Sequence, residues 1–82
     1  MSDTELLERI TVDPKIMVGK PIIRGTRLTV EFMLNLLGHG ATVEEILEEY
    51  PALSADDVNA CALFASKSLE NSSFMPLRAE TT

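Results

Sequence analysis

The spacing of apolar residues changes along the chain, from alternation near the amino terminus to a helical pattern after residue 30. Ile10 and Val12 alternate with polar neighbours, and Pro14 then interrupts the run. This pattern predicts a short strand, and the proline confines it to the edge of a sheet.

A second extended region is predicted between residues 20 and 30. The stretches 20–23 and 27–30 are rich in strand-forming residues, and the turn between them contains Gly25. This arrangement predicts a β-hairpin. Pro21 lacks the N–H group that an inner strand needs, so we expect the hairpin to pair at an edge or with another chain.

The first predicted helix follows directly on this region. Thr29 is suited to be its N-cap, and Gly38 or Gly40 can end it. Phe32 and Leu36 lie off its main apolar stripe, so the helix is apolar on more than one face. A second contact surface is therefore expected there, and a dimer interface would supply one.

Two further helices are predicted from capping patterns. Thr42 and Glu45 form a capping box that begins a short helix, which ends at Pro51. Ser54 begins a third helix of roughly four turns, with an acidic first turn and an apolar stripe from Val58 to Leu69; the pattern breaks after Glu70.

These elements predict a mainly α fold. We expect a three-helix, helix-turn-helix-like core of the homeodomain or winged-helix kind, preceded by a short β-hairpin arm. Residues 10–70 would form a single domain, with the β arm at 10–30 and the helices at 31–70. Residues 1–9 and 71–82 are expected to be tails. A chain of 82 residues has a thin core, so self-association or a partner would add to its stability.

Composition excludes several classes of protein. No apolar run approaches the roughly 18 to 20 residues of a membrane span. The first residues are acidic, the reverse of a secretory signal, so we expect a cytoplasmic location. Cys61 has no second cysteine to pair with, and His39 is the single histidine, so neither a metal site nor a cofactor is expected.

The formal net charge of -6 conceals a separation of the two signs. Residues 14–30 carry +4, whereas residues 31–66 carry -7 and contain no lysine or arginine. The four cations are Lys15, Lys20, Arg24 and Arg27. The chain therefore combines a basic arm with an acidic helical body.

The basic arm is the better candidate for binding nucleic acid. On a two-stranded ribbon, Lys20, Arg24 and Arg27 could reach phosphates or a groove of DNA. The alternative is that these cations solvate an edge strand, discourage aggregation, or pair with the acidic helices.

The third helix is a weaker candidate for reading DNA. Ser54 and Asn59 are neutral residues near its amino-terminal end, where a recognition helix contacts bases. Asp56 and Asp57 lie beside them and would repel phosphates.

No constellation of catalytic groups is visible in the sequence, so we expect that the chain is not an enzyme. His39 lies between two glycines and suits a helix C-terminus. Cys61 is flanked by alanines and suits a core position. The glutamates of the second helix suit a solvated face or a surface for a basic partner.

Four segments together carry a family resemblance. They are Ile10 to Pro14, the run Gly-Lys-Pro-Ile-Ile-Arg-Gly-Thr-Arg from Gly19 to Arg27, Val43 to Leu47, and Tyr50 to Leu53. In these segments the chain resembles the small bacterial domain-of-unknown-function family numbered 433, from about Arg9 to Ala65. The resemblance implies a helix-turn-helix-like fold and an antitoxin role beside a PIN-like ribonuclease, with possible binding of operator DNA.

The resemblance also selects candidate residues. Within the matching motif, Lys20, Arg24 and Arg27 are the candidates for binding DNA or a partner. Ser54 and Asn59 join them as candidates from the helix-turn-helix-like geometry of the third helix. The turn-forming candidates are Gly19, Pro21, Gly25 and Thr26. In the tail, Phe74, Met75, Leu77 and Arg78 are candidate toxin contacts, although twelve residues are too few for a long wrapping segment.

A second interpretation belongs to a different functional class. The chain could be a homodimeric protein-interaction module that never binds DNA, and the net charge of -6 favours this alternative. In either case we expect a homodimer, joined through the hairpins or through the first helix.

Overall fold

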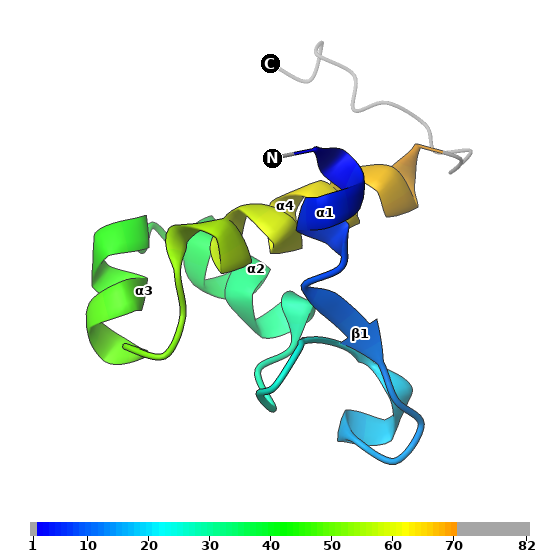
Figure 1. The fold of residues 1–82 in the computed structure, drawn as a ribbon. Coiled ribbons are helices and arrows are strands. Elements are labelled where there is room, and N and C mark those ends of the chain that lie inside the picture. Colours follow the sequence, from blue (N-terminus) through cyan, green and yellow to red (C-terminus); the bar gives the residue numbers. More distant parts are fainter. Residues whose placement is uncertain (1, 71–82) are drawn as a thin grey trace, which may run out of the picture.

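The computed structural model describes residues 2–70, which form four α-helices, a two-stranded antiparallel sheet and one 3-10 turn (Figure 1). In chain order the elements are α1 (Asp3–Leu7), β1 (Ile10–Val12), η1 (Met17–Gly19), β2 (Pro21–Ile23), α2 (Val30–Gly38), α3 (Val43–Glu49) and α4 (Ala55–Leu69). Within this range no helix is long and apolar enough to cross a bilayer. The predicted mainly helical class is confirmed.

A two-stranded antiparallel sheet is present, but it joins the predicted strand at 10–12 to residues 21–23, rather than 20–23 to 27–30. β1 and β2 are antiparallel and pair Ile10 with Ile23. The predicted strand over 27–30 is wrong, since this stretch contributes only an isolated bridge between Ile22 and Thr29. The reason is that the Thr29 hydroxyl accepts a hydrogen bond from Phe32 N at 2.9 Å and begins α2 as its N-cap.

The amino-terminal residues are not a simple tail, because residues 3–7 form α1. Ser2 and Glu5 make a capping box, and the acceptance of hydrogen bonds from Ser2 lowers the pKa of Glu5. The helix packs on α4, and Leu6 lies against the hydrophobic core. Tertiary packing therefore holds a five-residue helix that would be too short to persist alone.

The three later helices begin at the predicted caps. Thr42 forms its capping box with Glu45, and Ser54 forms one with Asp57. The backbone N–H of His39 donates to carbonyls of the last turn of α2, and its Nδ1 lies 2.8 Å from Asn35 O. The predicted helix-capping role of His39 is therefore confirmed.

The core lies where α2, α3 and α4 meet the buried side of the strand pair. Figure 1 shows α2 and α4 stacked, with α3 beyond their ends. The buried residues are Ile10, Ile22, Ile23, Thr29, Val30, Met33, Ile46, Leu53, Val58, Ala60 and Cys61. Burial, with a smaller contribution from Asp57, raises the pKa of the Cys61 thiol to about 11, as suits a small core residue rather than a nucleophile.

Candidate partner-binding surface

The turn between β2 and α2 presents two arginines to solvent. Its bend depends on Gly25, whose φ is +83°. The Thr26 hydroxyl donates to Ile23 O at 2.7 Å, and Leu28 N donates to Thr26 Oγ1 at 3.0 Å. Gly25 and Thr26 are thus turn-forming, as predicted, and Arg24 and Arg27 on either side are exposed.

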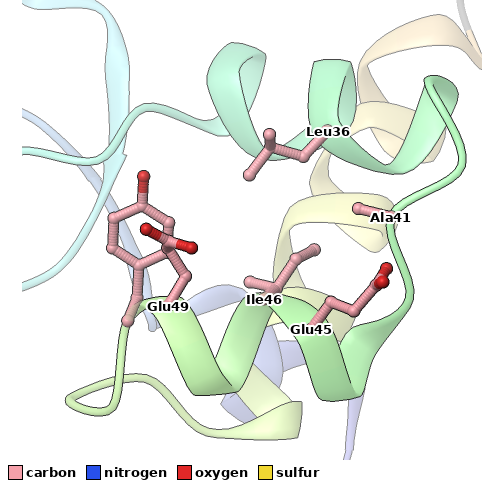
Figure 2. A pocket seen from close by; sticks show the side chains of 6 residues that line it. Leu36, Ala41, Glu45, Ile46 and Glu49 are labelled. Atoms are coloured by element: carbon pink, nitrogen blue, oxygen red, sulfur yellow. The ribbon is translucent and has the colours of Figure 1, made fainter.

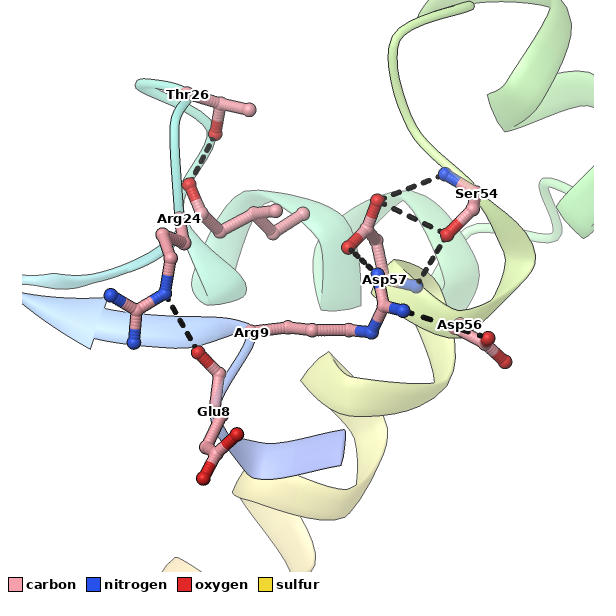
Figure 3. A network of polar contacts seen from close by, with 8 residues as sticks. Glu8, Arg9, Arg24, Thr26, Ser54, Asp56 and Asp57 are labelled. Carbon is pink, nitrogen blue, oxygen red and sulfur yellow. Dashed lines mark hydrogen bonds and ion pairs between the residues drawn. The ribbon is translucent and has the colours of Figure 1, made fainter. Parts of the chain in front are cut away.

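Arg24 is partly held by the backbone that precedes β1. Its Nε donates to Glu8 O at 2.8 Å, and its backbone N–H donates to Arg9 O at 2.7 Å. Figure 3 shows the other two guanidinium nitrogens directed away from this contact. The side chain lines a hollow with Glu5, Glu8, Arg9 and Asp57, so its surroundings are largely acidic.

Lys20 and Arg27 lie in different settings from Arg24. Lys20 Nζ pairs with Glu31 Oε1 at 2.7 Å, and hydrogen bonding to this ammonium lowers the pKa of Glu31. Both side chains are exposed, so the pair adds little stability. Arg27 lines one hollow near Gly25 and another beside Phe32, and within residues 2–70 its side chain makes no hydrogen bond or ion pair. The three cations therefore line no common hollow.

The start of α4 is acidic but has a counter-ion that the sequence did not reveal. Arg9 Nη1 donates to Asp57 Oδ1 at 3.1 Å, and Arg9 Nη2 lies 3.7 Å from Asp56 Oδ2 (Figure 3). Asp57 Oδ2 also accepts hydrogen bonds from Ser54 N at 2.9 Å and Ser54 Oγ at 3.3 Å. Ser54 is thus occupied as a cap, whereas Asn59 is exposed on α4.

The connection between the strands contains a strained, exposed turn that the sequence did not predict. Met17, Val18 and Gly19 have φ values of 50°, 55° and 76° in succession. Positive φ is costly for a β-branched residue such as Val18. Val18 is also 93% exposed, so no packing of its side chain offsets this cost. Gly19 lies in this turn, as predicted, with a positive φ. The prediction that Pro21 forms a turn is wrong, because Pro21 is the first residue of β2 and pairs with Val12. The result is an exposed apolar residue two positions before Lys20.

An apolar groove of about 180 Å³ lies between α2 and α3. Figure 2 shows Leu36 of α2 facing Ile46 of α3 across it, with Ala41 on the connection between the helices. Glu45 and Glu49 line the same groove from α3. The groove combines apolar and acidic side chains, and this combination suits a protein segment that carries apolar and basic side chains.

Over residues 2–70, no group of three or more His, Cys, Asp or Glu side chains is placed to hold a metal ion. The tail candidates Phe74, Met75, Leu77 and Arg78 lie outside the described residues.

The described elements define a class: a small, mainly helical domain with one antiparallel strand pair and solvent-exposed turns. A family model described as "Protein of unknown function (DUF433)" matches residues 10–65, more than half of the sequence. The chain belongs to this family, as the motif around Gly19 to Arg27 indicated.

Solved and curated relatives agree with this assignment. A crystal structure of a DUF433 member protein from Anabaena variabilis ATCC 29413 superposes with a TM-score of 0.73 and 30% sequence identity, over 82% of this chain and 66% of that one. The uncharacterized protein y4eO of Sinorhizobium fredii is 34% identical over 58 residues, which is 71% of this chain but 26% of the relative. An uncharacterized protein of Archaeoglobus fulgidus is 60% identical over 25 residues, 30% of this chain and 69% of that protein. The chain thus spans about a quarter of the Sinorhizobium relative's length.

Proposed function

We propose that this chain is a non-enzymatic, cytoplasmic binding protein that acts as an antitoxin and holds a PIN-like ribonuclease through protein contacts. The antitoxin role comes from the family resemblance. The observation that carries the binding role is the exposed turn from Arg24 to Arg27, with its two arginines on either side of Gly25. A guanidinium group binds a carboxylate through two parallel hydrogen bonds, and a metal-dependent ribonuclease site is rich in carboxylates.

The state of each arginine supports this role. Arg24 uses Nε for Glu8 O, which orients the side chain while leaving its terminal nitrogens available. Arg27 has no polar partner among the described residues, so a partner would not have to break an existing contact. Lys20 is a weaker candidate, because Glu31 already neutralises it.

Operator DNA is the second ligand in this proposal. Arg24 and Arg27 follow the end of a two-stranded ribbon, from which basic residues can reach phosphates. At the start of α4, Asp56 and Asp57 would oppose phosphates, although Arg9 offsets part of their charge. This acidity and the net charge of -6 favour the alternative function, a protein-interaction module without DNA binding.

One preparation tests both ligands. The tagged chain is co-expressed with the product of the adjacent reading frame, and the isolated chain and any complex are titrated with upstream DNA at several salt concentrations. A stable complex with salt-dependent DNA binding supports both parts. A complex without DNA binding supports the interaction module, and the absence of both would refute the antitoxin proposal.

Single substitutions then test the turn. Arg24→Ala and Arg27→Ala each remove one charge, and Lys67→Ala on α4 removes one charge outside the turn as the matched control. Loss of toxin binding in the first two variants alone supports the carboxylate role. If both arginines meet phosphates, each variant reduces the slope of log K against log salt by about 0.9. An unchanged slope rejects phosphate contact.

A further inference from the structure

Helix α2 has a second apolar face that the core does not cover. Val30 and Met33 are buried on one side of the helix. Phe32 lies off that stripe and remains 37% exposed, and Leu36 lines the groove toward α3. A large aromatic side chain exposed beside an open apolar groove marks a surface suited to binding another protein.

This face is continuous from the strained turn to the groove. The rings of Phe32 and Tyr50 meet edge to face, with centroids 6.1 Å apart and planes at 88°. Tyr50 lines both the groove and the neighbouring hollow that contains Met17 and Leu28. We call this surface the α2–α3 strip, defined by Met17, Leu28, Phe32, Leu36, Ala41 and Tyr50.

The two halves of the strip carry opposite charges that are free to pair. Arg27 lines the hollow beside Met17 and Phe32, whereas Glu49 lines the groove beside Leu36. Within residues 2–70 neither side chain makes a hydrogen bond or an ion pair. A surface with a cation in one half and an anion in the other is complementary to its own copy turned by a two-fold axis.

We propose that two copies of this chain pair face to face through the α2–α3 strip. In this isologous dimer, Arg27 of each copy meets Glu49 of the other, and the Phe32–Tyr50 pairs pack near the axis. The contact would cover apolar area on a domain whose small size limits its own core. The dimer would compete with the toxin or DNA of the proposed function for Arg27. Because dimerisation is measured without toxin or DNA, its failure is separable from that of the proposed function.

Charge reversal of the pair provides the test. The isolated chain is studied by sedimentation equilibrium over a range of concentrations, as the wild type, Arg27→Glu, Glu49→Arg and the double variant. The wild type is expected to dimerise. Each single reversal places like charges together twice per dimer and should raise the dimer dissociation constant about tenfold, whereas the double variant should restore it.

Matched controls separate this pairing from a general effect of charge. Glu48→Arg changes the neighbouring exposed residue of α3, which does not line the groove, and Lys67→Glu reverses a cation of α4. Both controls should retain the wild-type dissociation constant, and circular dichroism should show the same helix content in every variant. A wild type that stays monomeric overturns the proposal, as does a double variant that fails to recover the dimer.

Discussion

Replacement of Val18 by glycine should stabilise the protein, although it deletes a side chain. Val18 has a φ of 55°, in the left-handed region where an L-residue is strained by about 1–2 kcal/mol. Val18 is 93% exposed, so removal of its side chain costs almost no buried apolar surface. Glycine itself lowers stability by about 0.5–1 kcal/mol, because it increases the conformational entropy of the unfolded chain. The net gain is therefore about 0.5–1 kcal/mol.

This gain is measurable as a shift in the thermal midpoint. For a domain of this size, 1 kcal/mol corresponds to roughly 4–8 °C, so Val18→Gly should raise Tm by about 2–8 °C. Circular dichroism at 222 nm follows the transition, with all variants at one protein concentration because dimerisation would also shift Tm.

Val12→Gly is the matched control. Val12 is also an exposed valine, at 54%, but it lies in strand β1, where its backbone is unstrained. This substitution should lower stability by about 0.5–1 kcal/mol. Equal changes in Tm for the two variants, or a lower Tm for Val18→Gly, would refute the assignment of strain to the left-handed turn.

Three further outcomes follow from named contacts. Asp57→Ala removes the capping box of Ser54 and the ion pair of Arg9. It should lower the free energy of unfolding, measured in urea, by about 1–3 kcal/mol. A loss below about 0.5 kcal/mol, the effect of an ordinary surface change, would contradict this network. The buried Cys61 thiol, with its pKa raised to about 11, should react with Ellman's reagent at pH 8 only after denaturation. The free energy of unfolding should also fall as the pH rises from about 9 to 11, because the unfolded chain loses the thiol proton at a lower pH than the folded protein does. Gly25→Ala should cost about 1–2 kcal/mol by φ strain alone, since no atom lies within 4 Å of the added Cβ, and Gly38→Ala in α2, where φ is ordinary, should not destabilise.

Helices α2, α3 and α4 could be predicted because their signals are local. Each begins at a serine or threonine that caps the backbone N–H three residues later, and the two capping boxes are complete within four residues of sequence. The buried role of Cys61 and the capping role of His39 followed from their immediate neighbours for the same reason. The bend at Gly25 was likewise marked by the residue itself.

The pairing of β2 was predicted wrongly because Thr29 suits both a strand and a helix N-cap. Thr29 has a strand-forming side chain, but its hydroxyl caps α2, and this ends the extended run before a second strand can form. The short helix α1 had a signal in Ser2 and Glu5, but its length gave no apolar period to confirm it. Packing against α4 decided the outcome.

Parts of the candidate surface had no sequence signal at all. Nothing in a Met-Val pair favours positive φ, and the strain at Val18 arises from closing the connection between β1 and β2. The contact of Arg9 with Asp57 joins residues 48 apart. Arg24 and Arg27 line different hollows and Lys20 pairs with Glu31, and this separation likewise depends on where α1 and α2 lie, which local patterns do not encode.

The carboxylate of Asp57 binds Arg9 and so holds the amino-terminal segment against the start of α4. The unit that folds therefore includes residues that precede Ile10. A chain shortened to the family match, residues 10–65, would lose Arg9 and leave Asp57 without its counter-ion. It would also lose Leu6 from the edge of the core and the last turn of α4, where Lys67 pairs with Asp3 of α1. The segment that matches the family model is therefore smaller than the body that folds, because residues on both sides of it brace that body.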